Sequence, residues 1–159
     1  MVGEPIQQIS KKGLKVWRIH AMIQTVIVWL VLGGLSVCTY FFGWYEWLYI
    51  VFGVLAVVEA VCSIFIFPNI RWRHWRYEVR DEEIDLKYGL FIIKRVLVPM
   101  VRVQHVNTVQ GPILKHYHLA EISISTAATV HTIPLLSEEE ADALRHKISA
   151  LARVAEEDV

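Results

Sequence analysis

AMIQTVIVWLVLGGLSVCTYFF, residues 21–42, has no charged side chain over 22 residues. At 1.5 Å of rise per residue, an α-helix of this length crosses the roughly 30 Å hydrocarbon layer of a bilayer. A second apolar run, WLYIVFGVLAVVEAVCSIFIF over residues 47–67, has a similar length and contains one acid, Glu59. Because only GWYE separates the two runs, the sequence predicts an antiparallel hairpin with spans over 21–42 and 47–67.

Tryptophans mark the ends of both runs. Trp17 precedes the first run, Trp44 and Trp47 flank the turn, and Trp72 and Trp75 follow the second run. Indole rings favour the headgroup layer of a membrane, so these five residues are predicted to anchor the chain at the two interfaces. A pair of helices buried in a soluble core would leave this placement unexplained. A cleaved signal peptide is also excluded, because a second span follows almost at once.

The charges of the chain are distributed unevenly. Residues 1–80 contain eight Lys/Arg against four Asp/Glu, whereas residues 81–159 contain eight Lys/Arg against twelve Asp/Glu. A basic half near the membrane and an acidic distal half suit a protein held at an anionic bilayer. The same distribution argues against a nucleic-acid partner, which would require the positive excess on the soluble part.

Lysine and arginine predict the orientation of the hairpin. Basic side chains flank the start of the first span and the end of the second, and the intervening turn has none. Positive charge stays on the cytoplasmic side, so both termini are expected to be cytoplasmic. The predicted organisation is a cytoplasmic segment over 1–20, a hairpin over 21–67, a cytoplasmic domain over 68–154 and a tail over 155–159. The flanking basic residues are Lys11, Lys12, Lys15, Arg18, Arg71, Arg73 and Arg76.

Glu59 is the only acid within either span. A carboxylate at membrane depth costs several kcal/mol unless it is protonated, paired or turned toward other helices. Since no Lys, Arg or His lies at comparable depth, an ionic partner would come from another chain. Contact with another membrane subunit, a place along a transport pathway, and incidental placement all remain open.

After Pro68 the pattern changes to alternation of apolar and polar residues. WRYEV over 75–79, EIDLKYG over 83–89 and EISIST over 121–126 each place apolar side chains on one face and polar ones on the other. This period of two is typical of half-buried antiparallel strands. Pro99 is expected at an edge or a bend, because proline cannot donate a hydrogen bond to a central ladder.

A helix is predicted to close the chain. Ser137 and Glu140 have the spacing of a capping box, in which each side chain bonds the other residue's backbone N–H. The apolar stripe that follows is Ala141, Leu144, Ile148 and Leu151. The predicted fold is therefore an α+β membrane protein: a two-helix hairpin, then six or seven antiparallel strands, then a C-terminal α-helix.

Four stretches are specific: GLKVWR at 13–18, WRYEV at 75–79, RVLVPMVRVQHVNTVQGPILK at 95–115 and LAEISISTAATVHTIPLL at 119–136. Together with the hairpin and the acidic C-terminal helix, they resemble the bacterial membrane-flanked pleckstrin-homology (PH-like) family, in the form found in Bacillus-type bacteria. The resemblance implies a protein of the bacterial cytoplasmic membrane with a PH-like domain. It further implies a hetero-oligomer with a larger membrane protein that carries several copies of the domain, and it implies neither an enzymatic activity nor a cofactor.

Ligand and catalytic sites are not indicated. The first loop between strands, VRDEEI over 79–84, is acidic, which argues against phosphoinositide binding, and the fold alone would not establish it. The chain has no nucleophile elbow, phosphate-binding glycine loop or zinc-protease motif. His116 and His118 have no cysteine or carboxylate nearby at ligand spacing, so no metal site is predicted.

The stretch 98–113 is the candidate for recognition. Arg102 and Gln104 are expected on one face of a strand, and with His105 and Gln110 they form the predicted partner contact. The simpler alternative is that Arg102 and Gln104 brace a nearby loop. The resulting hypothesis is a membrane-anchored adaptor in envelope homeostasis or defence. The alternative is a subunit of a lipid- or peptide-export machine in which Glu59 lines a pathway.

Overall fold

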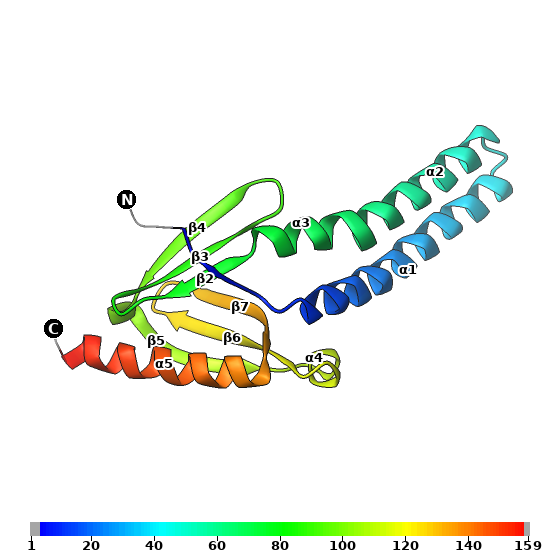
Figure 1. The fold of residues 1–159 in the computed structure, drawn as a ribbon. Helices are drawn as coiled ribbons and strands as arrows, with labels where there is room; N and C mark the ends of the chain where they lie inside the picture. Colours follow the sequence, from blue (N-terminus) through cyan, green and yellow to red (C-terminus); the bar gives the residue numbers. More distant parts are fainter. Residues whose placement is uncertain (1–3, 158–159) are drawn as a thin grey trace. The chain divides into compact units, whose positions relative to one another are not determined.

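The computed structural model describes residues 4–157, which form two compact units (Figure 1). Residues 17–70 make up one unit, the helical hairpin. The described residues before 17 and after 70 make up the other unit, the β domain. The domain is thus built from two separate parts of the sequence.

Two long helices form the hairpin. Helix α1 is Lys12–Phe41 and α2 is Trp47–Val61, which continues through the π-helical turn Cys62–Ile66 into α3, Phe67–His74. Both continuous helical stretches, of 30 and 28 residues, are long and apolar enough to cross a membrane, and almost none of their apolar side chains are buried within the protein. Helices that are apolar on all sides and not buried within the protein are typical of membrane spans. The helices extend beyond the predicted spans 21–42 and 47–67 at the ends away from the turn.

The π turn has a local cause. In a regular α-helix, residue 68 would donate its backbone N–H to the carbonyl of Ile64, but Pro68 has no N–H and its ring would clash there. The wider turn bonds the Phe67 N–H to the Cys62 carbonyl instead. This bond spans five residues instead of four, so the turn holds one extra residue. Such a turn lets a helix continue past a proline without breaking.

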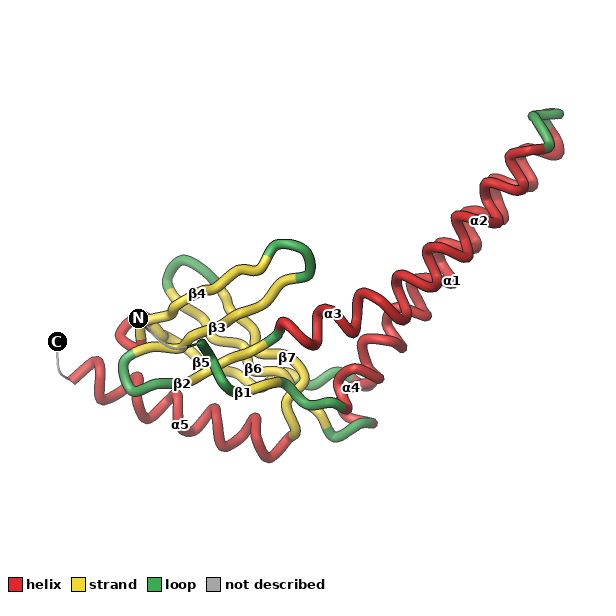
Figure 2. Tube along the Cα trace, turned by 45° about the horizontal axis from the view of Figure 1, so that its top comes forward, coloured by secondary structure: helices red, strands yellow, loops and turns green. Residues whose placement is uncertain are grey.

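The β domain contains two antiparallel sheets (Figure 2). One has the strand order β1-β2-β3-β4 and the other β5-β6-β7. A short helix, α4 (Pro112–His116), lies between β5 and β6, and α5 (Glu138–Glu157) ends the described chain. The strands are β1 (Gln7–Gln8), β2 (Arg76–Val79), β3 (Glu83–Gly89), β4 (Ile93–Pro99), β5 (Val103–Val109), β6 (Leu119–Thr126) and β7 (Val130–Ser137).

The predicted inward faces of the strands are confirmed. Tyr77 and Val79 of β2 are buried, and Glu78 between them is half-buried. On β6, Ile122 and Ile124 are fully buried whereas Ser123 is partly exposed. The alternation of the sequence therefore places the core between the two sheets and α5.

Helix α5 begins with the predicted capping box. The Ser137 backbone N–H donates to Glu140 Oε2 at 3.1 Å, and the Glu140 N–H donates to Ser137 Oγ at 3.3 Å. Ala141 and Ile148 are fully buried, and the helix packs against β5, β6 and β7. The tail expected over 155–159 is helical as far as Glu157; residues 158–159 lie outside the described residues.

The N-terminal segment belongs to the domain rather than standing apart over 1–20. Gln7 and Gln8 pair with Tyr77 and Arg76 of β2. The Ser10 N–H donates to the Leu135 carbonyl of β7 at 3.1 Å, which fixes the segment to the second sheet as well. Residues 1–3 of the predicted segment lie outside the described residues.

Candidate functional site

A groove opens where the chain passes from the first sheet to the second. Its volume is about 470 Å³. The end of β4, the 3₁₀ turn Met100–Arg102 and the start of β5 form one side, and the β6–β7 turn forms the other. The lining residues are Leu97, Val98, Pro99, Val101, Arg102, Val103, Gln104, Thr126, Ala127, Ala128, Thr129 and His131.

The 3₁₀ turn corrects one expectation. Arg102 was predicted on a strand beside Gln104, but Met100–Arg102 is a 3₁₀ helix and β5 starts only at Val103. Pro99 ends β4, and the Met100 N–H then donates to the Glu82 carbonyl at 2.8 Å while its side chain is buried. This anchoring turns Arg102 outward at the rim of the groove.

Gln104 also lines the groove, because it lies in an irregularity at the start of β5. Val103 pairs with Thr126 and His105 pairs with Ser125, so Gln104 is the extra residue of a β-bulge. A bulge re-aims the side chain of its extra residue. Arg102 and Gln104 therefore line one groove as neighbours, although they do not share the face of a strand.

The opposite side of the groove is a tightly bonded turn. The Thr126 N–H donates to the Thr129 carbonyl at 2.9 Å, and the Thr129 N–H donates to Thr126 Oγ1 at 3.1 Å. Thr129 Oγ1 lies 2.9 Å from His131 Nε2. Ala127 and Ala128 at the tip have small side chains, which keeps the groove open. Sequence reasoning missed this wall, and the SxSTAAT pattern of small residues was its only signal.

The remaining predicted contacts lie elsewhere. His105 is exposed on β5 and does not line the groove. The Gln110 amide donates to the Leu119 carbonyl at 2.9 Å and to a Glu138 carboxylate oxygen. Because Gln110 joins the end of β5 to β6 and α5, its side chain serves the fold.

Glu59 lies in a polar cluster within the hairpin. Thr25 Oγ1 on α1 donates to Glu59 Oε1 at 3.3 Å, and Ser63 Oγ in the π turn donates to the same oxygen at 2.8 Å. Neither hydroxyl is an ionic partner, so the expectation that an ionic partner would come from another chain stays a prediction. Among residues 4–157, Glu59 Oε2 is inaccessible and has no hydrogen-bond partner.

The tryptophans differ in their surroundings. Trp44 and Trp47, at the hairpin turn, are more than half exposed, and Trp17 is half-buried. Trp72 Nε1 donates to the Ile9 carbonyl at 3.2 Å, within the domain. Trp75 is only 4% exposed, so its prediction as an interface anchor is wrong: the ring packs in the domain, stacked on Tyr88.

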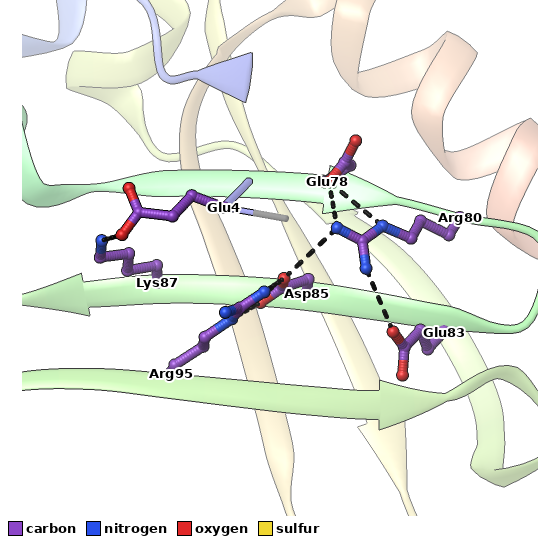
Figure 3. Close-up of polar contacts among 7 residues, drawn as sticks. All are labelled: Glu4, Glu78, Arg80, Glu83, Asp85, Lys87 and Arg95. Atoms are coloured by element: carbon purple, nitrogen blue, oxygen red, sulfur yellow. Dashed lines mark hydrogen bonds and ion pairs between the residues drawn. The ribbon is translucent and has the colours of Figure 1, made fainter. Parts of the chain in front are cut away.

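A charged cluster covers the outer face of the first sheet (Figure 3). Asp85, expected at the surface, is fully buried beneath Arg95 and Arg80. Arg80 also bonds Glu78 and Glu83, at 2.6 and 3.3 Å. The hydrogen bonds that Arg95 donates to Asp85 raise the pKa of Arg95, and those that Arg80 donates to Glu78 raise the pKa of Arg80. These charges satisfy one another, so the cluster stabilises the sheet and offers no ligand site.

The comparisons with known proteins agree with this architecture. Residues 15–152 match the Bacterial PH domain family. The chain is 50% identical to UPF0699 transmembrane protein YdbS of Bacillus subtilis (strain 168) over 159 residues, the full length of both. It is 28% identical over 103 residues to UPF0699 transmembrane protein YdbT of the same organism, covering 62% of this chain and 20% of that one. No solved structure was found to match the chain.

Proposed function

This chain belongs to the bacterial PH domain family, and on that premise we propose that it is a non-enzymatic membrane adaptor. In this proposal the hairpin anchors the chain in the bacterial cytoplasmic membrane. The β domain then binds a larger membrane protein that carries several copies of the same domain. The assembly serves envelope homeostasis or defence.

The groove carries the proposal. Leu97, Val98 and Val103 contribute apolar side chains to its lining, while Arg102 and Gln104 contribute hydrogen-bond donors. A groove lined by apolar side chains with a few polar groups at its edge is suited to binding an extended peptide segment. The guanidinium would bind a carboxylate or backbone carbonyls of the partner.

The relatives support the choice of partner. The match to YdbT covers 20% of that protein's length, which leaves room for further copies of the domain there. Two proteins anchored in one membrane meet at a high effective concentration, so a modest cytoplasmic contact suffices for assembly. The acidic turn at Asp81 and Glu82 argues against phosphoinositide as the ligand instead.

Both termini are cytoplasmic in this proposal. The basic residues at the two ends of the hairpin support it through the positive-inside rule. The pairing of Gln7 with Tyr77 adds support, because it requires the two ends of the hairpin to lie on the same side of the membrane.

Co-purification tests the adaptor function. The full chain is tagged in its own cells and the larger family member is quantified in the eluate. Reversing a charge at a protein contact costs several kcal/mol, so Arg102→Glu should lower recovery of the partner at least about tenfold. Arg153→Glu makes the same charge change on exposed α5, outside the groove, and should leave recovery unchanged. Equal recovery with both variants contradicts the proposal.

A second candidate function is favoured by one observation: Glu59 Oε2 has no hydrogen-bond partner within the described residues 4–157. In an export machine this oxygen would face the pathway of a lipid or peptide. Glu59→Gln should then abolish transport while co-purification persists. If the chain with Glu59→Gln keeps both its cellular activity and its co-purification with the partner, the export function is excluded.

A further inference from the structure

The hairpin between β3 and β4 carries an exposed apolar tip. Phe91, Ile92 and Ile93 are 79%, 76% and 48% exposed. In the described part of the domain, large exposed apolar residues otherwise occur singly along the sequence. Contiguous exposed apolar side chains usually mark a contact surface.

The tip has a fixed backbone. Gly89 has a φ of +151°, which side-chain-bearing residues rarely adopt. A Cβ at this position would also lie 2.1 Å from the Ile92 carbonyl oxygen. Glycine thus lets the backbone fold tightly under Ile92, and the apolar side chains project from a built turn.

Basic residues lie beside the tip. Arg76, Lys87 and Arg95 oppose one another across β2, β3 and β4, and Lys94 adjoins the tip itself. Like charges in such a row repel. Two carboxylates offset part of this charge: Glu4 bonds Lys87 at 2.6 Å, which lowers the pKa of Glu4, and Asp85 bonds Arg95 at 2.6 Å. Among residues 4–157, Arg76 and Lys94 form no ion pair.

The other end of β3 has the opposite character. The turn from β2 to β3 contains Asp81 and Glu82, both exposed, and Glu83 follows. The first sheet is therefore polarised along β3, with an apolar, basic end and an acidic end. This polarity complements an anionic membrane surface that faces the basic end.

The tip lies at the end of the sheet where the chain arrives from the membrane helix. Arg76, the first residue of β2, directly follows Trp75 and opposes Lys87, two residues before Gly89. The Trp75 and Tyr88 rings stack with centroids 5.7 Å apart. At 3.3 Å per residue, the tip reaches roughly 10 Å beyond the start of β2.

We propose that the β3–β4 tip inserts Ile92 and its neighbours into the interface of the anionic membrane that holds the hairpin. Lys94 and Arg76 bind acidic head groups around the inserted side chains, as basic residues do beside shallow apolar anchors. The contact orients the domain on the bilayer and does not depend on the proposed protein partner.

Single-copy nanodiscs test this insertion. The full chain carries Cys38→Ala and Cys62→Ala, and an environment-sensitive fluorophore is attached at Ile92→Cys or, as the matched control, at Asp81→Cys at the other end of β3. Fluorescence quenching by brominated lipid is then measured in discs of phosphatidylglycerol and of phosphatidylcholine. One copy per disc removes a second copy as the source of protection.

Lipid quenching is expected at position 92 and absent at position 81. Adding Lys94→Gln should reduce the ratio of inserted to uninserted tip about fivefold in phosphatidylglycerol, the contribution of one basic residue near an anionic surface. It should have little effect in phosphatidylcholine. Equal exposure of both labels to a water-soluble quencher, or protection at position 92 without lipid quenching, overturns the proposal.

Discussion

Arg95 on β4 clasps the carboxylate of Asp85 on β3, with Nε 3.0 Å from Oδ1 and Nη2 2.6 Å from Oδ2. The two hydrogen bonds leave from one planar guanidinium and hold a carboxylate that water does not reach. A bidentate pair of this kind fixes geometry as well as charge. It connects β4, an edge strand, to the interior of its sheet.

Asp85→Asn should therefore destabilise the domain. The substitution leaves Arg80 and Arg95 without their shared carboxylate, and hydrogen bonds to charged groups contribute about 2 kcal/mol each. Denaturant unfolding of the purified chain measures the change. Asp142→Asn is the control, because its 3.3 Å pair with Arg145 is exposed and should contribute less than about 0.5 kcal/mol. Equal losses from both substitutions would contradict a structural role for the cluster.

The register of β6 gives a second prediction. Ile124 is fully buried and Ser123 is partly exposed. Ile124→Asp buries an unpaired carboxylate, which costs several kcal/mol, and should abolish folding of the domain. Ser123→Asp should express and melt like the parent chain. Similar melting curves for the two variants would show that the strand faces are reversed.

Replacing Gly13 with alanine should destabilise the protein, although alanine usually stabilises a helix relative to glycine. A Cβ on Gly13 would lie 2.5 Å from the Leu135 Cβ, so Gly13→Ala should lower the free energy of unfolding by about 1–3 kcal/mol through overpacking. Gly34→Ala, in the same helix with nothing within 4 Å, should be neutral or stabilising. Thermal unfolding compares the two, and stabilisation by Gly13→Ala would refute the close packing of the N-terminal segment.

Tyr77 predicts a loss of stability in alkali. Burial raises the pKa of Tyr77 to about 12, and the Glu140 carboxylate adds to the effect. In the unfolded chain a tyrosine ionises near about 10. The folded state holds the phenolic proton more tightly, so this contribution is fully present below about pH 10 and is lost as the pH rises toward 12.

The test compares the free energy of unfolding of two variants across that window. In Tyr77→Phe the free energy of unfolding should fall less steeply between about pH 10 and 12, because no phenol remains at this position to ionise. Tyr45→Phe changes an exposed ring in the hairpin turn and should keep the parent slope. An unchanged slope in Tyr77→Phe would place the responsible group elsewhere.

Membrane orientation is tested by reporters. A fusion after residue 159 should behave as cytoplasmic, and a reporter inserted at Trp44 as external, because the basic residues flank only the other ends of the spans. Alkaline phosphatase and green fluorescent protein fusions measure the two sides. Labelling of the C-terminal fusion from outside intact cells would reverse the orientation.

The regular parts of the fold follow from local patterns in the sequence. Uninterrupted apolar runs predict the hairpin, alternation predicts β2, β3 and β6, and the Ser137–Glu140 spacing predicts the start of α5. The two-residue strand β1 has no such pattern, because Gln7 and Gln8 acquire their conformation only by pairing with β2. The burial of Asp85 also escaped prediction, since it depends on Arg95 folding over it from another strand.

The candidate groove was predicted in part. Arg102 and Gln104 stand out as long polar side chains in an otherwise apolar stretch. The 3₁₀ turn is hidden because VRVQ, residues 101–104, alternates as a strand would. The bulge leaves one trace, because the alternation breaks where Gln104 is followed by a second polar residue, His105. Thr129 lies in the distant β6–β7 turn and His131 at the start of β7, and only the pairing of β5 with β6 brings them to the same place.

The pairing of β1 with β2 also sets an order of events during biosynthesis. Gln7 leaves the ribosome long before Tyr77, so the first strand of the sheet waits, unpaired, while both membrane helices are made. A chain in which only one helix crossed would leave these two strands on opposite sides of the bilayer, with the sheet one strand short. Such a chain would keep β2 unpaired along one edge, so the complete four-stranded sheet forms only when both helices have crossed.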